Sequence, residues 1–121
     1  MRVLVTGGCG YLGSQLVRDL RHDPRFKGVQ LRILDNMQRG QHRALMGLEG
    51  DGSVQFVEGD ILDPAALRLA LQGIQQVVHL AAVVSTPMGF EHPAWMEQVN
   101  HWGTVRLVEA CLEAGVKHLL Y

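Results

Sequence analysis

A glycine-rich turn between a short apolar run and an amphipathic stretch constrains this chain more than any other feature. Glycines stand at positions 7, 10 and 13, directly after the apolar run Arg2–Thr6. Leu12, Leu16 and Leu20 follow at intervals of four residues, which places them on one face of a helix. We therefore predict a strand, a tight turn and a helix that begins near Gly10, whose N-terminus points free N–H groups at an anion.

Short apolar runs alternate with helical stretches along the rest of the chain. This alternation is typical of βαβ units, which build a parallel sheet that is buried on both faces. Right-handed crossovers and a change of direction between the first and fourth strands predict the order 3-2-1-4-5, with the glycine turn at the carboxyl edge. The runs interpreted as strands are Arg2–Thr6, Gln30–Leu34, Val54–Val57, Gln76–Leu80 and Val116–Leu120.

Capping residues predict two further helices. Asp63-Pro64 is typical of an N-cap followed by proline in the first turn of a short helix. A longer, fourth helix is predicted over Pro93–Ala114, with Gly115 as its C-terminal stop. Residues 36–52 are expected to form an irregular connection that contains one short helix. The stripe of the fourth helix that should face the sheet is Met96, Val99, Gly103, Leu107, Ala110 and Ala114.

The composition is that of a globular protein and excludes several classes of function. The 121 residues leave room for one domain, over residues 1–121, and 47% of them are hydrophobic. A net charge of −1 offers no basic field for nucleic acid, and no apolar run is long enough for a membrane span. Two cysteines cannot build a disulfide framework, which favours a reducing cytoplasm. None of the six histidines stands in a metal-binding pattern such as His-Glu-x-x-His.

Each glycine of the turn has a separate expected task in binding a dinucleotide. Gly7 permits the tight turn, Gly10 leaves room for a pyrophosphate, and Gly13 lets the helix pack closely on the sheet. Asp35 follows the second predicted strand, where an acid accepts the ribose hydroxyls. The alternatives are a purely structural turn and an Asp35 that is only solvated. The chain has no Gly-Lys-Ser/Thr, which excludes a P-loop for ATP or GTP.

Five segments in a fixed order connect the chain with one known family. They are Thr6-Gly7-Gly8-Cys9-Gly10-Tyr11-Leu12-Gly13, Leu34-Asp35-Asn36, Gly59-Asp60-Ile61, His79-Leu80-Ala81-Ala82, and Val99-Asn100-x-x-Gly103-Thr104. In these segments, over nearly its whole length, the chain resembles the extended short-chain dehydrogenase/reductase family. The resemblance implies a Rossmann-type doubly wound α/β fold with bound NAD. For the complete protein it implies an NAD-dependent enzyme that epimerises or dehydrates a nucleotide-linked sugar.

The resemblance also implies which residues line the cofactor. Asp35 would accept both ribose hydroxyls, and Asp60 would either contact the adenine amino group or cap the turn that follows it. An ionised Asp35 favours NAD over NADP, whose 2′-phosphate it would repel, and the counter-argument is the presence of Arg32, Arg39 and Arg43. The expected cofactor-binding residues are Gly7, Gly10, Tyr11, Leu12, Gly13, Asp35, Asn36, Asp60, Ile61, Leu80, Ala81, Ala82, Val84 and Asn100.

The catalytic groups of this family do not occur in the chain. They are a Ser or Thr just after the fifth strand and a Tyr-x-x-x-Lys helix, and Tyr121 has no lysine four residues on. We therefore expect a sheet truncated after its fifth strand, with the catalytic segment and the substrate domain absent. The 121 residues alone should not turn over a substrate.

Four residues beside the expected site receive secondary interpretations. His79 is interpreted as a packed histidine at a strand end, without an orienting partner. Cys9 is interpreted as a small filler rather than a nucleophile, although a helix N-terminus would lower its pKa. Ser85 and Thr86 follow the fourth strand and are expected to border the nicotinamide or the substrate.

The fourth helix is also the expected site of association. Trp95 and Trp102 lie seven residues apart and off the sheet-facing stripe, and members of the resembled family commonly dimerise through this helix and the next one. We therefore expect a homodimer. Two other functions remain open at this point: a non-catalytic dinucleotide-binding module that acts as a sensor or interaction protein, and a simple carbonyl reductase.

Overall fold

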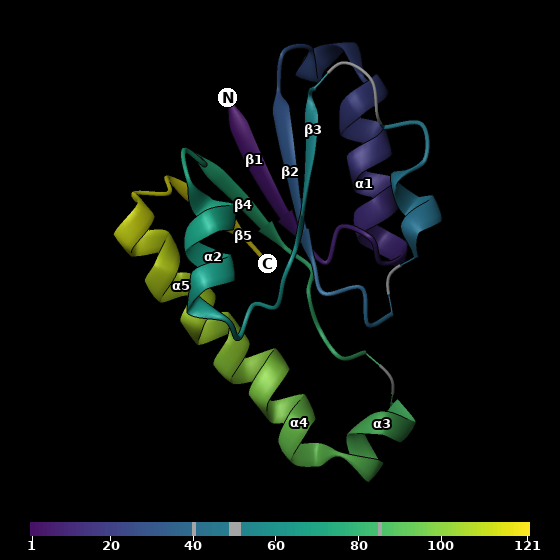
Figure 1. Cartoon of the computed structure of the whole chain (residues 1–121), viewed down its shortest axis with the longest axis vertical. Helices are drawn as coiled ribbons and strands as arrows, with labels where there is room; N and C mark the ends of the chain where they lie inside the picture. Colours follow the sequence, from purple (N-terminus) through teal and green to yellow (C-terminus); the bar gives the residue numbers. More distant parts are fainter. Residues whose placement is uncertain (40, 49–51, 85) are drawn as a thin grey trace.

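The computed structural model describes residues 1–39, 41–48, 52–84 and 86–121. Helices and strands alternate along these residues, and η denotes 3-10 or π-helical turns (Figure 1). In chain order they are β1 (Arg2–Thr6), α1 (Tyr11–His22), η1 (Pro24–Phe26), β2 (Gln30–Asp35), η2 (His42–Leu45), β3 (Val54–Glu58), α2 (Pro64–Leu71), β4 (Gln76–His79), α3 (Thr86–Glu91), α4 (Pro93–Glu97), the π-helical turn η3 (Gln98–Trp102), α5 (Gly103–Ala114) and β5 (His118–Leu120).

The five strands form one parallel sheet in the order β3-β2-β1-β4-β5, which confirms the predicted topology. The central strand β1 ends at Thr6, which stands in register with Leu34 of β2 and with His79 of β4. Asp35 ends β2 beside Glu58 of β3. The last residues of four strands therefore meet at one edge of the sheet, as the rule for ligand sites in open α/β folds requires.

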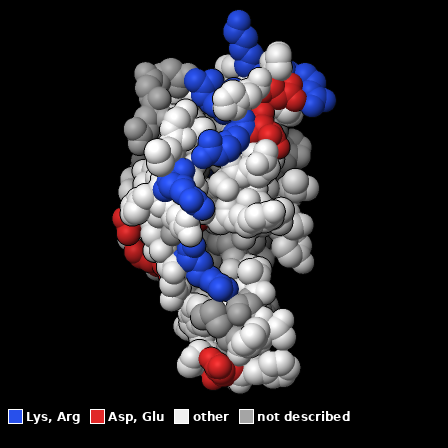
Figure 2. Space-filling model, turned by 90° about the vertical axis from the view of Figure 1, so that its right-hand side faces the viewer, with Lys and Arg blue, Asp and Glu red and all other residues white. Residues whose placement is uncertain are grey.

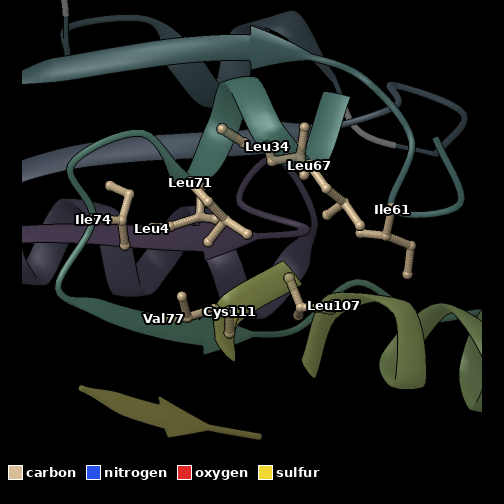
Figure 3. Packing of buried hydrophobic residues seen from close by; sticks show 10 residues of the cluster. Leu4, Leu34, Ile61, Leu67, Leu71, Ile74, Val77, Leu107 and Cys111 are labelled. Atoms are coloured by element: carbon tan, nitrogen blue, oxygen red, sulfur yellow. The ribbon is translucent and has the colours of Figure 1, made fainter. Parts of the chain in front are cut away.

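Helices cover both faces of the sheet, with α1 on one side and α2 and α5 on the other (Figure 1). Side chains of β1 alternate between the two layers: Leu4 packs with the α2 and α5 side, whereas Val3 and Val5 pack with Val17 of α1. Figure 3 shows the first of these clusters, in which α2 and α5 meet over the sheet. The central strands β1, β2 and β4 are largely buried, as predicted, whereas the edge strands β3 and β5 are only partly buried because each has a neighbour on one side only.

The predicted caps are present, but the fourth helix is not a single regular element. Asp63 accepts a hydrogen bond from the Ala65 N–H at 2.9 Å, and Gly115 ends α5 in the left-handed region at φ 71°. The predicted helix over Pro93–Ala114 is observed as α4, η3 and α5 in succession. Ala114 is exposed rather than part of the buried stripe, and α3 was not predicted.

In the parts of the chain that the structure describes, every helix is too short or too polar to cross a lipid bilayer.

Candidate functional site

A pocket of about 610 Å³ opens at the carboxyl edge of the sheet, within the usual size range of small-molecule sites. It brings together all of the predicted cofactor-binding residues except Asn100. The described residues that line it are Gly7, Gly10, Tyr11, Leu12, Gly13, Leu34, Asp35, Asn36, Gln38, Arg39, Gly59, Asp60, Ile61, Leu80, Ala81, Ala82, Val83, Val84, Trp95 and Val99.

The glycine turn fits closely against the chain around it. Gly7 has a φ of 69°, and a Cβ atom there would lie 2.8 Å from the backbone nitrogen of Ala81. A Cβ atom on Gly13 would lie 2.2 Å from the carbonyl oxygen of Gly7, so Gly13 permits close packing on the turn itself rather than on the sheet. Glycine at these two positions is therefore required by the fold of the turn.

The first turn of α1 leaves backbone donors at the pocket. Gly10 is the N-cap residue, and no side chain caps the helix. Tyr11 and Leu12 line the pocket, although their side chains are 94% and 68% exposed. The first N–H groups of a helix have no partner within the helix, and they lie at the positive end of its dipole. This end of the pocket can therefore bind an anion.

Asp35 connects the glycine turn to the exit of β2. Its buried carboxylate accepts the Cys9 N–H on Oδ2 and the Met37 N–H on Oδ1, both at 2.9 Å. Each carboxylate oxygen has a second lone-pair direction, so the group can still accept hydrogen bonds from a ligand. Burial, and then the nearby Asp35, raise the pKa of the Cys9 thiol to about 11. The predicted lowering of this pKa by the helix N-terminus is therefore wrong.

Asp60 both caps a turn and faces the pocket, so its two predicted roles, as a turn cap and as a cofactor contact, do not exclude one another. Its Oδ1 accepts the Leu62 N–H at 2.9 Å. Its Oδ2 accepts a hydrogen bond from the Asn36 side-chain amide at 3.3 Å. Asn36 and Asp60 thus join the exits of β2 and β3 along one wall of the pocket.

His79 lies between two threonine hydroxyls. Its Nδ1 is 2.6 Å from Thr6 Oγ1, and its Nε2 is 3.0 Å from Thr104 Oγ1. Thr6 Oγ1 accepts the N–H groups of Leu80 and Ala81, so its own proton is free to be donated to Nδ1. We infer a neutral imidazole that carries its proton on Nε2, in agreement with a His79 pKa lowered by burial. The expectation that His79 lacks an orienting partner is wrong.

The hydrogen-bond chain continues from Thr104 to the loop after β4. Thr104 Oγ1 donates to the carbonyl oxygen of Asn100 at 2.7 Å. The Asn100 side chain accepts the Val83 N–H at 2.7 Å and donates to the Val83 carbonyl at 2.8 Å. Asn100 is therefore behind the pocket wall: it holds Val83, which lines the pocket, instead of lining it directly.

The three arginines considered as cofactor contacts have different positions. Arg32 donates from Nη1 to the carbonyl oxygens of Ala70 and Gln72, both at 2.8 Å, at the end of α2 and away from the pocket. Arg43 is exposed in η2. Arg39 lines the pocket and is the one cation among its described lining residues. Figure 2 shows that Lys and Arg side chains follow one another along the face that carries α1 and η2.

Several residues of the pocket were missed from the sequence. Trp95 and Val99 enter it from α4 and η3, Val83 from the loop after β4, and Gln38 and Arg39 from the loop after β2. Val99 was placed on the sheet-facing stripe, and Trp95 stands one helical turn before it, which is the signal that could have identified Trp95.

Three further expectations concern Ser85 and Thr86, the two tryptophans, and metal binding. Thr86 begins α3 and is exposed, and Ser85 lies outside the described residues. The two tryptophans do not share one exposed surface, because Trp95 lines the pocket whereas Trp102 is 52% exposed. The described residues contain no group of three His, Cys, Asp or Glu side chains that could hold a metal ion.

Comparison with known proteins gives consistent matches. The model of a family described as the 3-beta hydroxysteroid dehydrogenase/isomerase family matches residues 4–121. The chain is 36% identical over 122 residues to the UDP-glucose 4-epimerase of Mycolicibacterium smegmatis, covering 100% of this chain and 38% of that protein. It is 33% identical over 119 residues to 3 beta-hydroxysteroid dehydrogenase type 7 of Mus musculus, covering 98% and 31%. The chain therefore spans about a third of the length of these relatives.

A solved structure agrees closely with the fold. The dTDP-glucose 4,6-dehydratase from Streptomyces venezuelae, crystallised with NAD and TYD bound, matches with a TM-score of 0.91 and 32% sequence identity. The match covers 98% of this chain and 38% of that structure. The sheet and helices described above are thus those of a Rossmann-type fold.

Proposed function

The chain belongs to the 3-beta hydroxysteroid dehydrogenase/isomerase family, within the extended short-chain dehydrogenase/reductases, and on that basis we propose that it is the NAD-binding portion of a nucleotide-sugar epimerase or dehydratase. The observation that supports this proposal most is the pocket at the carboxyl edge. It combines free helix N–H groups, a buried acid at the end of β2 and a second acid after β3 in one cavity.

The residues of the pocket fit a dinucleotide from end to end. The backbone N–H groups at the start of α1 would bind the pyrophosphate, for which the bare backbone of Gly10 leaves room. Asp35 would accept the hydroxyls of the adenosine ribose on its remaining lone pairs. Asp60 and Ile61 would contact the adenine. Ala81 and Ala82 would lie beside the nicotinamide half, where their small side chains leave space.

NAD, when bound, supplies the hydride acceptor for oxidation of a substrate hydroxyl. The residues of this chain hold and orient the cofactor, and none of them is proposed to move the substrate proton. His79 is neutral and has both ring nitrogens engaged by threonine hydroxyls, so it supports the wall of the pocket. We propose that catalysis belongs to residues outside these 121, and that the chain alone does not turn over a substrate.

NAD is proposed in preference to NADP because a carboxylate beside the ribose would repel a 2′-phosphate. Arg39 is the one described lining residue that opposes this choice, since its guanidinium could donate hydrogen bonds to that phosphate. Asp35 is buried and fixed by two backbone N–H groups, whereas the Arg39 side chain is exposed. The fixed carboxylate of Asp35 should therefore determine the preference for NAD over NADP.

The assembly and the location of the protein are also proposals. A homodimer through α4 and α5 is supported by exposed apolar side chains on this helical run, at Trp102, Val108 and Leu112. A cytoplasmic protein is supported by two free, buried thiols. We propose a nucleotide-linked sugar as the substrate, and neither nucleic acid nor a membrane as a partner.

The test is a titration and an activity panel with the full-length protein. NAD and NADP are titrated separately, and activity is then measured with UDP-glucose, dTDP-glucose, a 3β-hydroxysteroid and a simple ketone. We expect tighter binding of NAD and turnover of a nucleotide sugar. Turnover of the steroid alone would instead support a second candidate function, oxidation of a 3β-hydroxysteroid, which the names of the family model and of the mouse relative favour. Binding of NAD without any turnover would support a sensor module.

A further inference from the structure

Trp95 contributes an aromatic side chain to the wall of the pocket. Its indole is half-buried, and it lines the pocket together with Val99, one helical turn later. The other tryptophan, Trp102, is 52% exposed and is not a lining residue. The two tryptophans of the chain are therefore in different environments, and only one of them is in a position to contact a ligand.

The helical run that carries Trp95 packs on the residue next to Asp60. A Cβ atom on Gly103 would lie 2.6 Å from Cδ1 of Ile61, so the beginning of α5 packs directly on the residue that follows Asp60. Val99 stands one turn before Gly103, and Trp95 one turn before Val99. Trp95 and Val99 therefore belong to the same helical run that packs on Ile61, and all three residues line the pocket.

The orientation of α4 is supported from its other side. A Cβ atom on Gly89 of α3 would lie 2.8 Å from the sulfur of Met96, which shows that Met96 packs on α3. Neighbouring residues of a helix point about 100° apart. Met96 is thus held against α3, while the adjacent Trp95, which points in another direction, lines the pocket.

The residues at the adenosine end offer little else that could cover a purine ring. Ile61 and Val99 are aliphatic, and the Asp60 carboxylate can accept from an amino group at the ring edge. Tyr11, the other aromatic residue of the lining, lies at the glycine turn and is 94% exposed. A flat, polarisable indole is the group that favours contact with the face of a nucleobase.

We propose that Trp95 packs its indole on the adenine of the bound dinucleotide and so sets the affinity for ligands that contain this base. The inference rests on the proposed function, because it needs the pocket to hold a dinucleotide. It assigns to α4 a direct part in ligand recognition, beyond the expected contacts of the glycine turn and the two acids.

The experiment compares Trp95→Ala, Trp95→Phe and the matched control Trp102→Phe in the full-length protein. Affinities are measured by calorimetry for NAD, for ADP-ribose, which has the adenine but lacks the nicotinamide, and for nicotinamide mononucleotide, which lacks the adenine. Base-on-aromatic contacts predict that W95A weakens NAD and ADP-ribose binding by roughly tenfold, with a smaller loss for W95F, which keeps a ring. Binding of nicotinamide mononucleotide and all affinities of W102F should be unchanged.

Fluorescence provides a measurement that does not depend on the stability of W95A. The emission of the wild type minus that of W95F isolates the signal of Trp95, and ADP-ribose should quench this difference. Equal ADP-ribose affinities in all variants, with no quenching, would overturn the inference while the proposed function stands. A loss for nicotinamide mononucleotide but not for ADP-ribose would overturn it too, by placing Trp95 at the nicotinamide end. If the wild type binds neither NAD nor ADP-ribose, the proposed function itself fails.

Discussion

Asn100 holds both hydrogen-bonding groups of the Val83 backbone, accepting its N–H at 2.7 Å and donating to its carbonyl at 2.8 Å. These two hydrogen bonds resemble a backbone pair between neighbouring strands. They connect the loop after β4 to the helical run that carries Trp95. The carbonyl of Asn100 in turn accepts from Thr104, which contacts His79. The wall of the pocket is thus fixed from behind by side chains that do not line it.

Replacement of Asn100 should loosen this wall. Asn100→Ala leaves two backbone groups of the buried Val83 without partners, and we expect a loss of about 1–3 kcal/mol in the free energy of unfolding. Asn100→Asp can still accept the Val83 N–H but sets a carboxylate oxygen against the Val83 carbonyl oxygen, which adds repulsion, so its loss should be at least as large. Chemical denaturation of both variants and of the exposed neighbour Gln98→Ala measures the effect. Equal stability of all three would show that the pairing is dispensable.

Acid should destabilise the fold through His79. Burial lowers the pKa of this imidazole below its ordinary value of 6.5, so the unfolded chain binds more protons than the native one as the pH falls through that value. Stability is therefore complete above pH 6.5 and declines below it, with a slope of at most about 1.4 kcal/mol per pH unit from this group.

The pH effect is assigned by substitution. His79→Gln keeps an acceptor and a donor for the two threonines but cannot titrate, so its stability should depend less on pH below 6.5. The exposed His118→Gln is the matched control and should follow the wild type. Thermal unfolding measured from pH 5 to pH 8 separates them, and parallel curves for all three proteins would exclude His79 as the source.

Cys9 should be unreactive in the native protein. A pKa of about 11 in place of the ordinary 9.0 lowers the thiolate fraction at pH 8 about a hundredfold, and alkylation should slow accordingly. Because Asp35 contributes to the shift, Asp35→Asn should make Cys9 react faster. Iodoacetamide labelling followed by peptide mass spectrometry distinguishes Cys9 from Cys111, whose pKa burial also raises. Rapid native labelling of Cys9 would contradict the described geometry.

Asp35 should be needed for the turn as well as for the cofactor. Asp35→Ala removes the acceptor of the Cys9 and Met37 N–H groups, and we expect a loss of stability of about 1–3 kcal/mol together with weaker NAD binding. Glu58→Gln is a suitable control, since Glu58 stands in register with Asp35 but is exposed. Denaturation and NAD titration are measured on both. Unchanged values for D35A would remove this residue from both roles.

The fold could be predicted from the sequence because its signals are local and repeated. β1 was predicted with its observed bounds, and the caps at Asp63 and Gly115 mark helix ends where local backbone chemistry decides. The π-helical turn over Gln98–Trp102 could not be predicted, because its residues continue an ordinary helical pattern. α3 begins at Thr86-Pro87, a pair that is typical of helix starts, and this signal was overlooked.

Residues that line the pocket could be predicted where they belong to a short motif of neighbouring residues. Hydrogen bonds between residues from distant segments could not be predicted. Thr6 and His79 are 73 positions apart and are brought together by strand pairing, so no sequence spacing reveals their hydrogen bond. The Cys9 pKa was predicted in the wrong direction because burial outweighs the helix end. Arg39 lies in a loop whose path depends on the positive φ of Met37, which no local residue type indicates.

The π-helical turn η3 determines how the chain would respond to the loss of one residue. A π turn closes i→i+5 hydrogen bonds where an α-helix closes i→i+4 bonds, so it holds one residue more for nearly the same rotation. Deletion of one residue between 98 and 102 that restored regular α geometry would therefore leave α4 in nearly its present orientation relative to α5, and Trp95 would stay beside the pocket. The loss of a single codon should thus be tolerated at this turn, whereas the same loss within the regular helix α5 would turn the residues before it by about 100°.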